Sequence, residues 1–200
     1  MKKGISILIV VLAILAIFAG WYIGIRNKLV KYDEEVAAQW SQVESNYQRR
    51  NDLIGNLVKT VQGAADFERS TYREITEARA NANSIKLDAS DLTEENIQAY
   101  QAAQDRLGQA LNRTIAVTVE NYPQLTATQN FRDLQVQLEG TENRINVARE
   151  NFNGSVRRYN TAIRQFPSNI VAAMANFEKR GYFKSVAGAE TAPDVQFDFN

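Results

Sequence analysis

Cysteine and histidine are both absent from the 200-residue sequence. The lack of cysteine excludes disulfides, thiolate nucleophiles, zinc–sulfur sites and lipid-modified cysteine. The lack of histidine removes the commonest metal ligand and the commonest general base near neutral pH. The 23 basic side chains are balanced by 23 acidic ones, so the chain has no positive surplus with which to bind phosphates. We therefore expect no catalytic residue, no cofactor, no metal, no nucleic-acid partner and no small-molecule substrate.

Proline and glycine are also scarce, at three and ten residues. Few interruptions of this kind favour long helices. The expected fold is all-α: an N-terminal transmembrane helix continues into a long antiparallel bundle of three long helices plus a short C-terminal helix. The expected division is a membrane anchor over residues 1–25, a helical bundle over residues 26–183 and a flexible tail over residues 184–200.

No charged residue lies between Gly4 and Ile25. At roughly 1.5 Å per residue this run reaches about 33 Å as a helix, enough to cross a hydrocarbon core of about 30 Å. Trp21 and Tyr22 stand near its end, where amphipathic rings favour the headgroup layer. The run predicts a membrane span. A cleaved signal peptide is the alternative, but the run exceeds the usual signal core of about 7–15 residues and no A-x-A cleavage site follows.

Cations flank this span on both sides, in nearly even number, so their count hardly decides the orientation. A short, lysine-led N-terminal tail is typical of a signal anchor that keeps its N-terminus in the cytoplasm. We expect a single-pass protein whose bundle lies on the non-cytoplasmic side. The flanking cations are Lys2, Lys3, Arg26, Lys28 and Lys31.

A heptad repeat of apolar residues follows the span and keeps its phase for about 55 residues. Gly55 and Gly63 weaken a helix by about 1 kcal/mol each relative to alanine, without ending it. The repeat predicts one helix from the membrane to Ser84, about 90 Å long beyond the bilayer. The alternative is a reversal near residues 51–55, which would give a compact four-helix bundle.

Two further helices are marked by their ends. Thr93 is the expected N-cap of the second helix, and Pro123 ends it. The third helix begins after Thr126 or Thr128 and continues to Pro167. Its main apolar positions fall seven residues apart: Phe131, Leu138, Ile145, Phe152, Tyr159 and Phe166.

These two helices, about 45 and 60 Å long, can cover only the distal part of a 90 Å first helix. The membrane-proximal stripe of the first helix would then have no partner within the chain. We expect other copies to cover it, which makes the protein a homo-oligomer. The expected assembly interface consists of Leu29, Val36, Trp40, Val43, Tyr47 and, as its polar position, Arg50.

The C-terminal region holds two apolar segments. A short amphipathic helix is expected to stop at Gly181. In the tail that follows, Val195, Phe197 and Phe199 alternate with polar residues, as in an edge strand or a docking peptide. The short helix could dock on its own bundle, on a bilayer or in a groove of a partner. The candidate partner-docking residues are Ile170, Met174, Phe177, Val195, Phe197 and Phe199.

Some polar residues invite a functional interpretation. Arg50 and Glu68 occupy apolar positions of the heptad, where an unpaired charge is costly. They are either a register-setting or partner-binding pair across helices, or residues at the edge of the stripe that are solvated or bonded to polar neighbours. Residues 142–144, beside Gly140, could line a cleft or form an ordinary solvated face.

Several stretches carry a family resemblance: residues 40–43 (WSQV) and 47–58 (YQRRNDLIGNLV) in the first helix, and residues 130–135 (NFRDLQ), 138–145 (LEGTENRI) and 166–169 (FPSN) in the third. In order and spacing they resemble the LemA family of bacterial membrane proteins. The resemblance implies one N-terminal membrane helix and an antiparallel bundle at the bacterial inner membrane, and it supplies no catalytic mechanism. The family usually has proline at the position of Gly55, which would kink the first helix.

These features predict a non-catalytic, membrane-anchored helical scaffold that self-assembles or organises membrane proteins or membrane shape. The alternative is an adaptor or regulator of a membrane-bound enzyme such as a protease, which docks through the bundle or the C-terminal tail. The expected partners are the lipid bilayer, further copies of the chain and another membrane protein.

Overall fold

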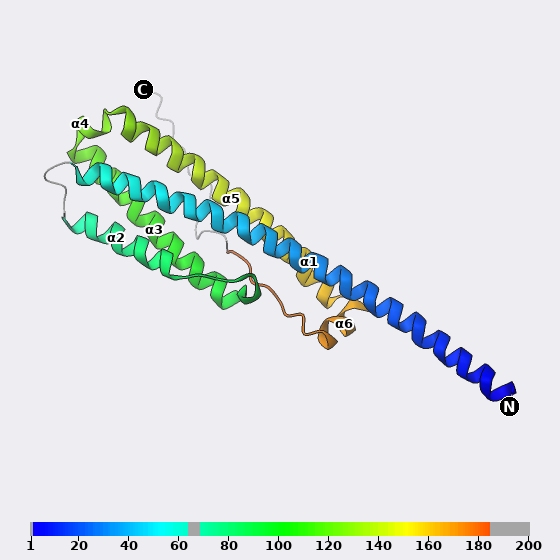
Figure 1. Cartoon of the computed structure of the whole chain (residues 1–200). Coiled ribbons are helices and arrows are strands. Elements are labelled where there is room, and N and C mark those ends of the chain that lie inside the picture. Colours follow the sequence, from blue (N-terminus) through cyan, green and yellow to red (C-terminus); the bar gives the residue numbers. More distant parts are fainter. Residues whose placement is uncertain (1, 64–68, 185–200) are drawn as a thin grey trace, which may run out of the picture.

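The computed structural model describes residues 2–63 and 69–184, and all its regular elements are helices (Figure 1). The all-α prediction is therefore confirmed. In chain order the elements are α1 (Lys2–Gln62), α2 (Arg69–Ser84), the 3₁₀ turn η1 (Ala89–Asp91), α3 (Glu94–Asn121), α4 (Pro123–Thr126), α5 (Gln129–Arg164) and α6 (Ser168–Met174).

Helix α1 is unbroken over 61 residues, and its N-terminal part projects alone beyond the bundle (Figure 1). The large apolar side chains of that part are exposed, from 45% at Val11 to 73% at Ile17. By length and composition this helix could cross a membrane. The helix passes Gly55 without reversing, so the alternative of a turn near residues 51–55 is not adopted.

Helix α1 ends at Gln62, and α2 returns antiparallel to it, so the prediction of one helix to Ser84 is wrong (Figure 1). Gly63 forms the last turn, and its N–H donates to the carbonyl oxygen of Lys59 at 3.3 Å. The heptad phase continues across the break because Ile75 and Ala82 of α2 point into the same core as α1. A periodic pattern reports which residues face the core, and it does not report the direction of the chain.

The bundle consists of two helix pairs, α1 with α5 and α2 with α3. Three contacts fix the antiparallel register of α1 and α5: Arg50 with Glu142, Trp40 with Phe152 and Glu35 with Arg158. Each step toward the N-terminus on α1 thus matches one step toward the C-terminus on α5. Continued to the end of α5, this register places Arg164 opposite Lys28, just after the C-terminal end of the charge-free run.

The buried apolar residues form two clusters along the bundle. The proximal core lies nearest the projecting part of α1, and the distal core lies around the α1–α2 reversal. The proximal core contains Leu29, Val36, Trp40, Val43, Tyr47, Leu92, Ile97, Tyr100, Ile145, Ala148, Phe152, Val156, Tyr159, Ile163, Val171, Ala172 and Phe183. The distal core contains Leu53, Ile54, Leu57, Val61, Ile75, Ala82, Leu107, Ala110, Leu111, Phe131 and Leu138.

The helix ends follow local capping chemistry. The Thr93 hydroxyl accepts from the Asn96 N–H at 3.2 Å, which confirms the predicted N-cap of α3. Of the two candidates for α5, Thr128 is the N-cap, since its hydroxyl accepts from the Phe131 N–H at 3.4 Å. Helix α6 stops at Met174 rather than at Gly181, because Asn176 adopts the left-handed conformation with φ 55°.

Candidate functional site

Residues 177–184, here called the strap, lie extended along the bundle after α6 and are held by side-chain amides. Three carboxamides each bind the N–H and the C=O of one strap residue, at 2.9–3.1 Å. Asn160 binds Arg180, Asn153 binds Phe183 and Gln101 binds Lys184. A side-chain amide presents one donor and one acceptor, so it pairs with a peptide group as a neighbouring strand would. At these three points the bundle therefore binds the backbone of an extended chain, and the side-chain amides make these bonds whatever side chains the bound residues carry.

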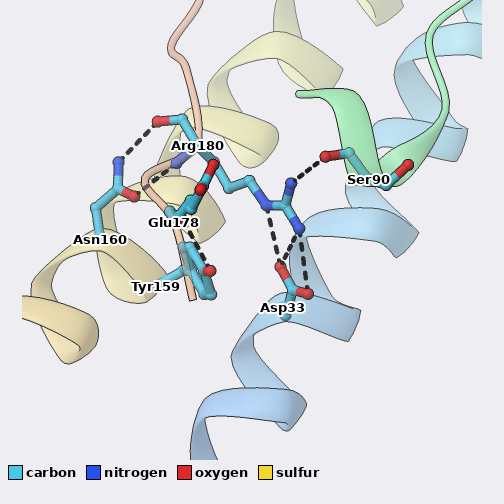
Figure 2. Close-up of polar contacts among 6 residues, drawn as sticks. All are labelled: Asp33, Ser90, Tyr159, Asn160, Glu178 and Arg180. Carbon is cyan, nitrogen blue, oxygen red and sulfur yellow. Dashed lines mark hydrogen bonds and ion pairs between the residues drawn. The ribbon is translucent and has the colours of Figure 1, made fainter. Parts of the chain in front are cut away.

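Arg180 is the most connected residue of the strap, and Figure 2 shows its contacts. Its guanidinium donates to both carboxylate oxygens of Asp33 on α1, at 3.0–3.3 Å, and to the carbonyl oxygen of Ser90 in η1 at 2.7 Å. Bidentate pairing of this kind fixes geometry as well as charge. Arg180 thus ties α1, η1 and the strap together at one point.

Tyr159 of α5 completes this junction. The guanidinium of Arg180 lies 5.8 Å from the centre of its ring, and its hydroxyl donates to the Glu178 carbonyl oxygen at 2.8 Å (Figure 2). Burial, together with the negative charge of Asp33, raises the pKa of Tyr159 to about 12. The phenol is therefore neutral at physiological pH and serves as a hydrogen-bond donor.

Gly181 lies against the start of α3. Its N–H donates to the Leu92 carbonyl oxygen at 2.8 Å. A Cβ at this position would stand 2.6 Å from the Thr93 carbonyl oxygen and 2.6 Å from the Glu94 Cα. Glycine is required here because the two backbones approach too closely for any side chain.

Arg50 joins three helices from a buried position, with 4% of the residue exposed. One terminal nitrogen donates to the Gln104 carbonyl and side-chain oxygens, at 2.9 and 2.8 Å, and the other to Glu142 at 3.0 Å. Its guanidinium also lies 4.9 Å from the centre of the Tyr47 ring. Arg50 is therefore bonded to polar neighbours on α3 and α5. Glu68 lies outside the described residues.

The predicted assembly stripe is buried inside the single chain. The exposed fractions of Leu29, Val36, Trp40, Val43 and Tyr47 are all 3% or less. The premise that the chain leaves this stripe uncovered is wrong, and no second copy is needed to cover it. Because α1 turns back at Gln62, its partner helices begin about 33 Å nearer the membrane than a helix to Ser84 would place them.

Trp40 is the centre of the proximal core. Its ring contacts Tyr100, Phe152 and Phe183, with centroid separations of 5.2, 5.6 and 6.2 Å. Its indole N–H donates to the Leu87 carbonyl oxygen at 3.1 Å. Four segments that are distant in sequence therefore meet on this one side chain.

The candidate docking residues of the C-terminal region separate into three groups. Ile170 and Met174 are 45% and 63% exposed, whereas Phe177 is half-buried and packs edge-on against Tyr159. The short helix α6 does dock on its own bundle, but it does so through its opposite face, where Val171 and Ala172 are buried. Val195, Phe197 and Phe199 lie outside the described residues.

A cleft between α3 and α5 begins at the point where Gln101 holds Lys184. These two helices belong to different pairs, and the buried Arg50 forms part of the floor. Glu142 lines this cleft, whereas Asn143 and Arg144 line a shallower groove between α5 and α1. The remaining lining is rich in amides and carboxylates: Gln104, Asp105, Gln109, Asn112, Gln135 and Glu139.

Burial raises the pKa of several titratable groups in the bundle. Burial raises the pKa of Tyr47 and of Tyr100, which keeps both phenols protonated. Partial burial and the neighbouring Asp88 raise the pKa of Glu44. Within residues 2–63 and 69–184, no group of three acidic side chains is placed to hold a metal ion.

Comparison with known proteins places the chain by its sequence. The family model described as LemA family matches residues 39–197, which include the last part of α1 and all the helices that follow it. The chain belongs to the LemA family. This confirms the resemblance seen in the sequence.

Two relatives indicate the range of this family. Magnetosome protein MamQ of Magnetospirillum gryphiswaldense is 28% identical over 182 residues, and the match covers 82% of this chain and 66% of the relative. This chain therefore spans just under two thirds of the length of that magnetosome protein. Protein LemA of Metamycoplasma hominis is 26% identical over 171 residues, with 86% of this chain and 74% of the relative covered.

The strap is the feature that the sequence analysis missed. Its three amide partners stand one residue after a buried aromatic in each case: Gln101 after Tyr100, Asn153 after Phe152 and Asn160 after Tyr159. An uncharged polar residue repeatedly beside the core stripe was the available signal. Taken singly, each resembles an ordinary boundary residue.

Proposed function

We propose that this protein is a non-catalytic scaffold, anchored in the membrane by α1, that organises copies of itself, other membrane proteins or membrane shape at the bilayer surface. The observation that carries the proposal is the continuity of α1. One helix runs from the exposed apolar segment into the buried core with no break between Lys2 and Gln62. A bundle joined in this way stays at a fixed distance from the bilayer.

The chemistry of the chain supports a structural rather than a catalytic role. The sequence lacks histidine and cysteine, and its best-connected polar groups, Arg50 and Arg180, are occupied by partners within the chain. Their bonds join helices and the strap. Polar groups used in this way fix the positions of the helices and the strap relative to one another.

The place of this scaffold is proposed to be the bacterial inner membrane, crossed once, with the bundle on the non-cytoplasmic side. Support comes from the charge-free run, its short lysine-led start and the family. Three relatives are named as magnetosome proteins. By analogy, we propose that this chain serves in building or shaping a membrane region.

Counting copies in a membrane tests the scaffold directly. The chain has no native cysteine, so Ala80→Cys, at an exposed position on α2, accepts a single dye. The labelled protein, reconstituted in vesicles together with solubilised native membrane proteins, should show several bleaching steps per spot or immobilise a membrane partner. Single-step spots that diffuse freely at every protein density, on vesicles of unchanged shape, would contradict the scaffold.

A second candidate function is that of an adaptor for a membrane-bound enzyme. The specific observation in its favour is the amide-lined cleft between α3 and α5, which continues from the point where Gln101 already binds extended backbone. An extended segment of a partner protein would be held there in the same manner as the strap.

Two variants separate the adaptor from the scaffold. Removal of residues 186–200 should abolish binding of a partner that the tail recruits and leave the copy number unchanged. Asn112→Arg, which fills the cleft, should abolish binding of a partner that the cleft recruits. If neither variant changes the binding of a co-purifying enzyme, the adaptor function is contradicted.

A further inference from the structure

Three exposed apolar side chains lie on the α5–α6 turn and on α6, at the end of the bundle from which the projecting part of α1 emerges. Phe166, Ile170 and Met174 are 80%, 45% and 63% exposed, and they are spaced four residues apart along the α5–α6 junction and α6. The opposite side of α6 carries the buried Val171 and Ala172, which belong to the proximal core. The helix is thus amphipathic, and its apolar character continues outward to a surface that the described chain leaves open.

The register of the bundle gives the height of this surface. Arg164 lies opposite Lys28, so Phe166 and α6 come level with the last residues of the charge-free run. Consistently, Trp21, Tyr22 and Ile25 pack against the core cluster that contains Val171 and Ala172. Figure 1 shows α6 at the end of the bundle where α1 emerges alone.

Charge at this level matches a lipid surface. The exposed cations Arg26, Lys28 and Lys31 follow the charge-free run, and Arg164 stands opposite them. Phosphate headgroups attract such side chains, while apolar side chains beside them reach the acyl boundary. The nearby Asp33 is already paired with Arg180, which leaves the positive side chains facing outward.

We propose that Phe166, Ile170 and Met174 form a second membrane contact, a foot that rests at the headgroup–acyl boundary of the bilayer that α1 crosses. A single helix allows a bundle to tilt and rotate freely about its span. A foot set beside the helix fixes both, and the bundle then stands at one angle to the membrane. This inference rests on the membrane anchor of the proposed function, and it adds a defined orientation to it.

Fluorescence quenching by labelled lipids tests the foot. An environment-sensitive dye is attached to Met174→Cys in the otherwise intact protein, reconstituted in vesicles of phosphatidylethanolamine and phosphatidylglycerol. Val136→Cys is the matched control, because Val136 is equally exposed, at 67%, but lies on α5 far from α6. Phe18→Cys in the span reports on the anchor itself.

The account predicts that nitroxide-labelled lipid tails remove most of the emission from the Met174 and Phe18 labels and leave the Val136 label unchanged. Quenching of the Met174 label by aqueous iodide, to the same extent as the Val136 label, would overturn the foot. Shielding of the Met174 label from both quenchers would also overturn it, since protein would then cover the site. If the Phe18 label also escapes the lipid quencher, the anchor fails together with the foot.

Discussion

The two halves of the bundle are built differently. The proximal core is aromatic, and it draws residues from α1, α3, α5, α6 and the strap around Trp40. The distal core is mainly aliphatic, with Phe131 as its only ring among the buried described residues, and it joins the two helix pairs. The Arg180 junction closes the proximal half, whereas the distal half carries the open cleft between α3 and α5.

This difference indicates how firmly each half of the bundle is held in one geometry. Segments that are far apart in sequence contact one another in the proximal half, and these segments must separate together for it to open. The proximal half is therefore held in one geometry. The distal half carries the cleft between α3 and α5, where the proposed adaptor function would place a partner chain. In the proposed scaffold, the proximal half would set the position of the bundle at the bilayer.

The largest expected effect is the loss of Trp40. Trp40→Ala should lower the free energy of unfolding by about 3–5 kcal/mol, because it removes a buried indole with three ring contacts and a hydrogen bond. The distal control Leu57→Ala, also fully buried, should cost less within the usual range of about 2–5 kcal/mol. Urea unfolding of the detergent-solubilised protein, followed by circular dichroism, measures both. A smaller loss for Trp40→Ala than for Leu57→Ala would reverse the comparison.

The strap supplies the next effect. Gly181→Ala should destabilise the protein by about 1–3 kcal/mol, because the added methyl group meets backbone atoms of Thr93 and Glu94 at 2.6 Å. Gly140→Ala on α5 is the control, since its Cβ would meet no atom within 4 Å. It should gain about 0.5–1 kcal/mol from helix propensity. Opposite signs in the same unfolding measurement support the close approach, and equal values would refute it.

The ion pairs of the two halves should differ as well. Asp33→Asn breaks a pair in which Arg180 is only 15% exposed, and a loss of about 1–2 kcal/mol is expected. In Glu74→Gln, the distal pair with Arg113 is lost, but those side chains are 42% and 63% exposed and the loss should stay below about 1 kcal/mol. A distal loss as large as the proximal one would show that burial does not rank these pairs.

At neutral pH, Tyr159→Phe should have a smaller effect than Asp33→Asn, about 1 kcal/mol for one hydrogen bond. The folded protein holds the pKa of this phenol at about 12, against about 10 when unfolded. The unfolded chain therefore releases the proton first, so wild-type stability is full below pH 10 and declines as the pH rises through about 12. The variant has no phenol at position 159, so its stability does not fall for this reason. The difference in unfolding free energy between wild type and variant should therefore shrink between pH 10 and about 12. A difference that stays constant from pH 9 to about 12 would contradict the raised pKa.

Much of the fold could be predicted from the sequence, because helix ends and core faces are local properties. Thr93 and Pro123 mark the bounds of α3 through capping and backbone chemistry alone. The reversal after Gln62 could not be predicted in the same way, since the apolar phase of α1 resumes in α2. Because the first helix was predicted to continue to Ser84, the stripe from Leu29 to Tyr47 had no expected partner within the chain. The predicted assembly interface depended on that error.

The junction around Arg180 shows the other limit. Its bonds to Asp33 join residues 147 positions apart, and local sequence patterns carry no information on such pairs. The same holds for Gln101 and Lys184, whose pairing depends on where the strap passes after α6. Non-local polar contacts of this kind become visible only when the chain path is known.

The most direct test of the account is hydrogen–deuterium exchange of the intact protein in nanodiscs that hold one copy each. The account predicts slow exchange across residues 29–47, because the chain itself covers this stripe, and the same rates when several copies share a disc. Fast exchange in single-copy discs that becomes slow only when copies meet would contradict it, and would return the stripe to an interface between chains.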